Sequence, residues 1–347
     1  MKIVIAFTIL CLSSKLQAQL MTVSAEGGER VIDWTSEKNN LSEDNPFLFG
    51  SGCSVGPTKA YVSSCLAAQG NSSYKAKNLF DWDPQTAWVE GKSDYGIGEY
   101  FEVDLILGSS GISIFNGYQK SYDAWKNNSR VKKIKVYADG QPVCYVELKD
   151  LMGYQTFSLP VDYLTQYDTY RFEIIEVFPG NKYKDVAISE ICNLGCCFNS
   201  NTSILTSNTL VSADLMENGG HITSIDMHSS EVTENQLKQK ISVKHAHLLH
   251  LETNSHWIEM TSSHTLYFKD YGFTTLLNIL KEKKLKNLKD LENTLEVMIW
   301  NEKTNEKVFE TITSIDVCEG DFTTYSLLGI DQAETYIING FVSRSER

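Results

Sequence analysis

Short runs of alternating hydrophobic and polar residues dominate the chain between about residue 100 and residue 175. Period-two alternation places hydrophobic side chains on one face, as in a half-buried strand. The clearest runs span residues 100–105, 112–115, 133–137 and 170–175. Asp139-Gly140 follows the third run and favours a hairpin turn, because both residues tolerate positive φ. The pattern predicts an antiparallel β-sandwich and an all-β fold class.

The N-terminus has a different pattern, which is typical of an export signal. Lys2 precedes an apolar run over residues 3–12, and Leu16-Gln17-Ala18 ends in a small residue suited to cleavage. A membrane-spanning helix needs about 20 apolar residues, so this run is too short to be an anchor. We therefore predict a signal peptide over residues 1–18, a polar lead-in segment over residues 19–44 and a secreted protein without a transmembrane anchor.

Length and charge restrict the class of protein further. The chain has 347 residues and a net charge of −13, with 22% charged and 11% aromatic residues. This length suggests two globular domains, and the composition has enough core-forming residues for both. Nucleic acid is excluded as the main partner, because affinity for DNA comes mainly from Lys and Arg that neutralise phosphates.

The composition changes near Gly195. All seven histidines come after it, beginning with His221, whereas the last of the six prolines is Pro179. We therefore place a first domain at residues 45–195 and a second domain at residues 196–347.

The cysteines indicate one reactive thiol. Export would remove Cys11 and leave seven: Cys53, Cys65, Cys144, Cys192, Cys196, Cys197 and Cys318. An odd number in an exported protein implies a thiol that is unpaired or reactive, and the adjacent Cys196-Cys197 pair is the place to look. The other six allow many disulfide pairings, of which Cys53 with Cys65 closes a short loop.

Several ordered motifs of the first domain resemble a known family. They are YKAKNLFDWDPQTAW at residues 74–88, GIGEY at residues 96–100, NGYQKS at residues 116–121 and the segment 127–130. Together they resemble discoidin-like jelly rolls, especially the NADase-type glycan-binding modules. The resemblance implies a sugar-binding or adhesive module rather than an enzyme active site.

Aromatic and polar residues of these motifs are candidates for contact with a glycan. Aromatic rings could stack on sugar faces and polar groups could bond hydroxyls; the candidates are Trp88, Tyr118, Lys120 and Trp125, with Asp81 and Asp83. In the alternative interpretation Trp82 and Trp88 are core aromatics and Asp81 caps a turn.

The second domain has a second set of ordered motifs. It opens with Cys197-Phe198, contains Thr261-Ser262-Ser263-His264, and ends with Tyr336-Ile337-Ile338-Asn339-Gly340. In this order and spacing they resemble the Hint fold shared by Hedgehog autoprocessing domains and inteins, which implies a β domain. Leucines at helical spacing within residues 276–291 predict a short surface helix in it.

The Hint resemblance implies single-turnover autoproteolysis. Cys197 would attack the carbonyl of Cys196 and exchange the amide for a thioester, which needs a thiolate and a proton for the leaving nitrogen. By similarity, His264 would protonate the nitrogen and Thr261 would hydrogen-bond the scissile peptide. Water, a thiol, an amine or an alcohol could then accept the first domain, so a cell-surface acceptor is also conceivable.

The ending departs from the intein pattern. Val342 is followed by Ser343 instead of by the His-Asn pair that cuts the downstream bond, and Thr265 replaces a proline often found after the histidine. We therefore expect one cut and no splicing. In the alternatives, a disulfide to Cys196 or Cys318 silences Cys197, or His264 is structural, and the chain is a non-catalytic extracellular glycan-binding or adhesion protein with a degenerate Hint domain.

No cofactor or metal is expected. His245 and His247 would share a strand face, but His250 would point to the other one, and no nearby Cys or carboxylate completes a tetrahedral zinc set. The two carboxylates at Asp81 and Asp83 fall short of the 6–8 oxygens that calcium requires.

Overall fold

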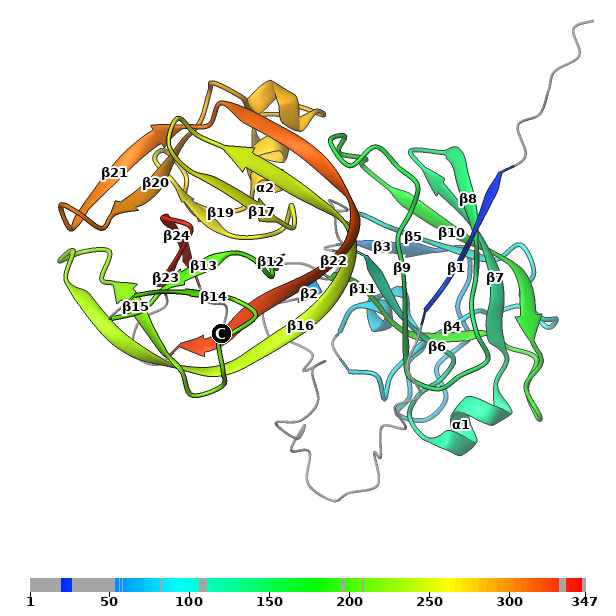
Figure 1. Cartoon of the computed structure of the whole chain (residues 1–347). Coiled ribbons are helices and arrows are strands. Elements are labelled where there is room, and N and C mark those ends of the chain that lie inside the picture. The colour runs from blue at the N-terminus through cyan, green and yellow to red at the C-terminus, as the bar shows by residue number, and fades with distance from the viewer. Residues whose placement is uncertain are drawn as a thin grey trace, which may run out of the picture.

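The structure is a computed structural model that describes residues 20–26, 54–55, 57, 59–81, 83–105, 111–194, 197–207, 209–330 and 335–344. The predicted signal peptide, Cys53, Trp82 and Cys196 lie outside these residues. The chain forms two β-rich bodies, one up to residue 194 and one from residue 197, which lie side by side (Figure 1). The all-β class is confirmed. Within the described ranges, no helix combines the length and the apolar character needed to cross a membrane.

The first domain is a sandwich of two sheets. The six-stranded sheet has the order β1(Met21–Ser24), β8(Gln141–Glu147), β7(Arg130–Ala138), β10(Tyr170–Phe178), β5(Tyr100–Val103), β3(Ala60–Val62). The other sheet has the order β2(Ser54–Val55), β11(Ala187–Leu194), β6(Ile112–Asn116), β9(Tyr154–Phe157), and β4(Trp88–Val89) pairs with β11. The four predicted strand runs are thus confirmed as β5, β6, β7 and β10.

The core of this sandwich is aromatic and aliphatic. The rings of Phe101 and Phe172 stack with centroids 4.8 Å apart, and Trp88 meets Phe101 edge-on at 5.7 Å. The predicted hairpin is confirmed, because Asp139 (φ 45°) and Gly140 (φ 77°) both have positive φ between β7 and β8. This is the backbone geometry that a two-residue hairpin turn requires.

The beginning of the predicted lead-in segment forms a strand. Residues 21–24 form β1, which pairs in parallel with β8 from Met21↔Cys144 to Ser24↔Glu147. Val23 packs against the first domain's core and Ala25 is buried. Burial of these side chains and pairing with the edge of β8 explain why so short a polar segment is ordered.

The second domain is dominated by two long strands. β16(Val232–Glu252) and β22(Ser314–Ile330) pair antiparallel from Leu237↔Ile330 to Glu252↔Ser314 and curve around the domain (Figure 1). Their five-stranded sheet has the order β15(His221–Ile225), β16, β17(Trp257–Met260), β12(Phe198–Asn199), β22.

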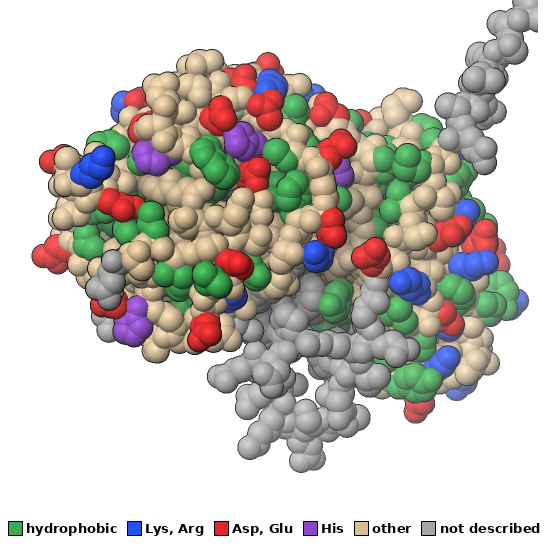
Figure 2. Space-filling model, in the orientation of Figure 1, with side chains coloured by type: hydrophobic (Ala, Val, Ile, Leu, Met, Phe, Trp, Pro, Cys, Tyr) green, Lys and Arg blue, Asp and Glu red, His purple; other side chains and the backbone are tan. Residues whose placement is uncertain are grey.

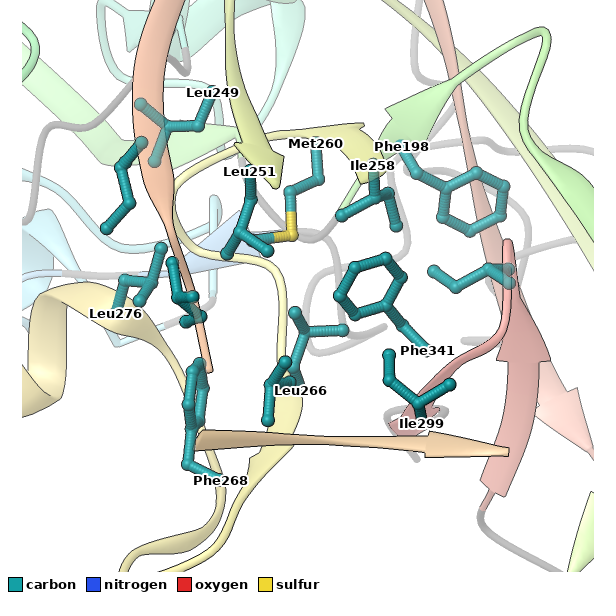
Figure 3. Close-up of a cluster of buried hydrophobic side chains, with 14 of the residues drawn as sticks. Phe198, Leu249, Leu251, Ile258, Met260, Leu266, Phe268, Leu276, Ile299 and Phe341 are labelled. Carbon is teal, nitrogen blue, oxygen red and sulfur yellow. The ribbon is translucent and has the colours of Figure 1, made fainter. Parts of the chain in front are cut away.

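The remaining strands of the second domain form an eight-stranded sheet. Its order is β14(Leu210–Ser212), β13(Ser203–Leu205), β23(Thr335–Ile338), β24(Phe341–Arg344), β18(Leu266–Phe268), β20(Glu296–Asn301), β21(Glu306–Thr311), and β19(Gly272–Thr274) pairs with β18. Figure 3 shows the core that these elements enclose, in which Phe198 lies near Ile258, Met260 and Phe341. Burying one such side chain stabilises a fold by about 1.5–3 kcal/mol. Phe198 therefore holds the start of β12 firmly in place.

The predicted surface helix of the second domain is two shorter helices. α2(Leu276–Glu282) begins at the N-cap Thr275, and a 3-10 helix follows at Leu288–Leu291. Lys284 lies between them with φ 56°, a conformation that an α-helix cannot contain. Among its described residues, the first domain has one α-helix, α1(Tyr122–Asn127), and a 3-10 helix at Ala76–Leu79.

Backbone hydrogen bonds between the two domains join the segment 163–168 to the segment 285–288. Leu288 N–H donates to Leu164 O at 2.8 Å, and Gln166 N–H donates to Lys286 O at 2.7 Å. Lys286 Nζ lies 3.0 Å from a carboxylate oxygen of Asp168. These contacts join the domains independently of the peptide link at residues 194–197.

Candidate active site

Cys197 lies at the entrance to the second domain. It immediately precedes β12, whose Phe198 pairs with Met260 of β17 on one side and Tyr325 of β22 on the other. Its side chain is fully buried. The neighbouring strands therefore fix the backbone of Cys197 three residues after the first domain's last strand ends at Leu194.

Thr261 binds the backbone of Cys197 at both ends. The Thr261 N–H donates to Cys197 O at 2.8 Å, which continues the pairing of β12 with β17. The Cys197 N–H donates to Thr261 Oγ1 at 2.9 Å, and this hydroxyl lies 3.2 Å from Cys197 O and donates to it. The Cys197 nitrogen belongs to the Cys196–Cys197 peptide bond. Thr261 thus contacts the amide nitrogen of the bond that the sequence predicts to be cut.

His264 is buried one turn after Thr261. The backbone N–H of His264 donates to Thr261 O at 3.0 Å. The imidazole ring meets the ring of Phe198 edge-on, with centroids 5.6 Å apart. His264 Nε2 lies 2.9 Å from Ser343 Oγ, and this hydroxyl donates to Thr265 O at 2.8 Å. A serine hydroxyl has one proton, so Ser343 must accept from Nε2–H. Neutral His264 is therefore the tautomer whose Nδ1 carries a lone pair.

Ser343 is a residue of this site that the sequence analysis noted only as a departure from the intein ending. It lies on β24, which pairs with β18 through Leu266↔Ser343. The chain separation of 79 residues between His264 and Ser343 gives no local signal for their contact.

The closing Asn339-Gly340 motif has a structural function in this arrangement. Asn339 (φ 47°) and Gly340 (φ 85°) form the turn between β23 and β24. Asn339 Oδ1 accepts from Ser203 N–H at 2.8 Å, and Asn339 Nδ2 donates to Trp257 O at 3.1 Å. The turn thus fixes β24, and with it Ser343, against β13 and β17.

Three of the other cysteines carry free thiols: Cys65, Cys144 and Cys318. The structure therefore does not contain the disulfide suggested between Cys53 and Cys65. It also does not contain the bridge to Cys318 that would silence Cys197. Burial raises the pKa of the Cys144 thiol to about 12, so this thiol is not reactive at neutral pH.

Two of the six candidates for contact with a glycan, Trp88 and Trp125, are wrong. Trp88 is 0% exposed and Trp125 is 3% exposed, so neither ring has a face for a ligand. Their indole N–H groups donate to Ser64 O (2.9 Å) and Asn116 O (3.0 Å), as buried tryptophans usually do. Tyr118 is half-buried and meets Tyr74 edge-on at 6.3 Å, and Lys120 is exposed.

Asp81 and Asp83 lie beside a third carboxyl group that the sequence analysis missed. Glu190 on β11 accepts from Asp83 N–H at 2.9 Å. The pKa of Glu190 is raised to about 10, mainly because the carboxyl group is buried. Asp81 accepts from Thr86 Oγ1 at 2.9 Å and from Asp83 N–H at 3.2 Å, as the turn interpretation predicts.

The three neighbouring histidines of β16 do not converge. His245 is buried with Nδ1 2.8 Å from Thr324 Oγ1, and the ring of His247 packs on Tyr163 of the first domain with centroids 3.9 Å apart. His250 instead faces Glu259 and Cys318, and one ligand atom from each of these three lies within 4.8 Å of the others. The sequence predicts that no nearby Cys or carboxylate completes a tetrahedral set with the histidines. Strand pairing brings a carboxylate and a Cys from distant parts of the chain beside His250, which gives a set of three ligand residues.

Comparison with known proteins agrees with the character of the first domain. Residues 52–193 match the family described as "NAD glycohydrolase translocation F5/8 type C domain". The predicted discoidin-like resemblance of this region is thus confirmed. A search of curated proteins finds no match.

Solved structures similar to the chain are inteins and an intein-like domain. The bacterial intein-like domain from Clostridium thermocellum is 20% identical, covers 43% of this chain and 98% of its own, and has a TM-score of 0.35. The DnaB intein from Synechocystis sp. is 15% identical over 44% of this chain and 99% of its own, with a TM-score of 0.35. The DnaX mini intein from Spirulina platensis is 10% identical over 43% of this chain and 99% of its own, also with a TM-score of 0.35.

Proposed function

We propose that the chain cuts its own backbone once, between Cys196 and Cys197, and so breaks the covalent link between the first domain and the second. The observation that carries this proposal is the pair of bonds between Thr261 and Cys197, in which the leaving amide nitrogen is held 2.9 Å from Thr261 Oγ1 in a buried site. The bond lies in the short link between two domains with separate cores.

The reaction begins with an N-to-S acyl shift. Cys197 Sγ attacks the carbonyl carbon of Cys196, so that a C–S bond forms and the C–N bond breaks. The thiol proton passes to His264 Nδ1 and from there to the Cys197 nitrogen, which becomes the free amine of the second domain. Water then hydrolyses the thioester, which gives a carboxylate on Cys196 and restores the Cys197 thiol. A thiol, amine or alcohol in place of water would transfer the first domain to that acceptor.

Positioning supports these functions of the two residues. Thr261 and His264 are joined by the bond from His264 N–H to Thr261 O, so one tight turn carries both the group that holds the nitrogen and the group that protonates it. The bond to Ser343 leaves Nδ1 as the basic nitrogen of neutral His264. The free thiol at Cys318 removes one of the disulfide partners that would silence Cys197.

The intact mass of the purified full-length chain tests this proposal. We expect two fragments that meet at Cys196/Cys197, in an amount that grows with time or on addition of dithiothreitol or hydroxylamine, which attack thioesters. Cys197→Ala should abolish the cut, and Cys65→Ala, which removes an exposed thiol of the first domain, should leave it unchanged. Only intact mature chain under all conditions, or a cut that persists in Cys197→Ala, would contradict the proposal and favour a degenerate Hint domain in an adhesion protein.

We also propose that the protein is exported by the signal peptide at residues 1–18 and that the first domain binds a glycan or a cell-surface acceptor. The match to a discoidin-like family supports a recognition module, and Tyr118 and Lys120 remain the accessible candidates. On a glycan panel, we expect the full chain to bind and Tyr118→Ala and Lys120→Ala to bind less. Tyr61→Ala, which alters an exposed ring elsewhere in the domain, is the matched control. Equal binding by all variants would place the ligand elsewhere.

A further inference from the structure

Strand pairing brings three metal-binding residue types together on one side of the second domain. His250 of β16 pairs with Glu259 of β17 and with Asp316 of β22, and Leu248 pairs with Cys318. Cross-strand partners point to the same side of a sheet, so His250, Glu259 and Cys318 share one face. The His250 and Glu259 side chains are 23% and 19% exposed, so an ion could reach them from solvent. Figure 2 shows histidines at the surface of the second domain.

The distances suit one small cation. His250 Nδ1 lies 3.7 Å from Glu259 Oε1, Cys318 Sγ lies 3.9 Å from the same oxygen, and all three atoms lie within 4.8 Å of one another. Ligand bonds of about 2.0–2.3 Å in a tetrahedral zinc site place the ligand atoms about 3.3–3.8 Å apart. A small contraction of these side chains would therefore complete the geometry.

Surrounding groups already orient two of the three ligands. His250 Nε2 lies 2.9 Å from Glu252 Oε1, which directs Nδ1 toward Glu259 and Cys318. Glu259 Oε2 accepts from Asn199 Nδ2, so Oε1 is the oxygen that faces the cluster. A carboxylate on the far nitrogen of a ligating histidine is the usual arrangement in metal sites. Asp316, on the same face, is bound by Lys289 at 2.6 Å and stays outside the ligand set.

We propose that His250, Glu259 and Cys318 form a binding site for one divalent ion of zinc's preferences, with three protein ligands and a fourth position for water. A nitrogen, an oxygen and a sulfur donor together favour Zn²⁺ over Mg²⁺ or Ca²⁺, which prefer oxygen alone. On binding, the Cys318 thiol gives up its proton to solvent and the thiolate sulfur bonds to the ion. The ion would join β16, β17 and β22 and raise the temperature at which the second domain unfolds.

Titration of the full chain with Co²⁺ tests the site. Cys197→Ala serves as the parent chain, because it cannot make the proposed cut and therefore stays intact. Metal binding is then measured independently of whether the self-cleavage proposal holds. We expect one Co²⁺ per chain with a thiolate-to-cobalt charge-transfer absorption band, displaced by Zn²⁺. Cys318→Ser should abolish the band, and His250→Ala, which removes a ligand, should weaken binding strongly. Glu252→Gln, which removes the partner of that ligand, should weaken binding by about 10–100-fold.

Two matched controls make the result specific. Cys65→Ser removes an exposed free thiol of the first domain, and His221→Ala removes a histidine that pairs with Glu234 at 2.5 Å. Both should leave the band and the affinity unchanged. Far-ultraviolet circular dichroism checks that each variant is folded, and Glu259→Gln, which preserves side-chain shape, replaces Cys318→Ser if that variant does not fold. A parent without the band, a band that survives in folded Cys318→Ser, or an undiminished affinity for Co²⁺ in folded Glu259→Gln would overturn the proposal.

Discussion

Both domains bury polar side chains, but they bond them differently. In the first domain Asn116 exchanges two bonds with the backbone of Val131, at 2.7 and 2.9 Å, and Gln119 does the same with Gly153, at 2.7 and 3.1 Å. Each of these amides satisfies one backbone donor and one backbone acceptor. Among the buried polar groups of the second domain are a thiol (Cys197), a hydroxyl (Thr261) and an imidazole (His264), which gather at one end of β12.

The contrast separates stability from chemistry. An amide that both donates to and accepts from the backbone has no proton to transfer at neutral pH, so its burial serves the fold. Cys197, Thr261 and His264 are equally buried, yet the thiol and the imidazole carry exchangeable protons beside a peptide bond. We therefore expect changes in the first domain's core to alter stability and changes around β12 to alter cleavage.

The largest effect is expected in the first domain's core. Trp88→Ala should lower the free energy of unfolding of that domain by about 3–5 kcal/mol, because the fully buried ring leaves a cavity. Urea unfolding followed by fluorescence should show the first domain's transition at lower urea and the second domain's transition unmoved. Tyr61→Ala, at an exposed ring, should change stability by less than about 0.5 kcal/mol. Equal shifts of both transitions would show that the domains unfold as one unit.

Removal of the Thr261 hydroxyl should slow cleavage without a large loss of structure. Thr261→Val keeps the shape but cannot bond the Cys197 nitrogen, and we expect the rate of fragment formation to fall by about 10²–10³-fold. Thr261→Ser, which keeps the hydroxyl, should restore most of the rate. The rate is followed by gel densitometry, with thermal unfolding as the control for folding. An unchanged rate in Thr261→Val would make Thr261 merely structural.

Stability of the first domain should fall as the pH rises, because of Glu190. Its pKa is raised from about 4.5 in the unfolded chain to about 10 in the fold, so the folded state binds the extra proton between these values. The contribution of this proton to the free energy of unfolding is therefore fully present below pH 4.5 and is lost progressively toward pH 10. Glu190→Gln should flatten this decline and stabilise the domain at pH 8 by on the order of 1–3 kcal/mol. Parallel pH profiles of variant and parent would refute the assignment.

The smallest effect is expected at Ser343, which positions His264. Ser343→Ala removes the acceptor of Nε2–H and should slow cleavage by about 10-fold or less. It should also move the midpoint of the pH–rate profile, because the imidazole of His264 loses its hydrogen bond to Ser343. A substitution that affected packing alone would leave this midpoint unchanged. Ser343→Thr keeps the acceptor and is expected to keep the midpoint. A slower rate with an unmoved midpoint would assign Ser343 to packing alone.

The sequence predicts what local patterns encode. Alternation places β5, β6, β7 and β10, and Asp139-Gly140 places a turn, because each depends on neighbouring residues. The Thr261–His264 spacing likewise locates one half of the candidate site.

Long-range pairing accounts for what sequence analysis missed. β1 pairs with β8, more than a hundred residues away, and β22 pairs with β16 over residues 237–252 of that 21-residue strand. Ser343, Glu190 and Cys318 reach their partners through sheet register, which one sequence does not reveal. Trp88 and Trp125 are wrongly predicted to contact a ligand, because the sequence does not distinguish an exposed aromatic residue from one buried in the core.

The contacts between segments 163–168 and 285–288 have a consequence for the fate of the products. The backbone bonds of Leu288 and Gln166 and the packing of Tyr163 on His247 do not involve residues 194–197. Breaking the covalent link would thus leave a nicked pair still held together, with the new carboxylate kept beside the thiol that produced it. Departure of the first domain then becomes a separate event, governed by dissociation of this interface.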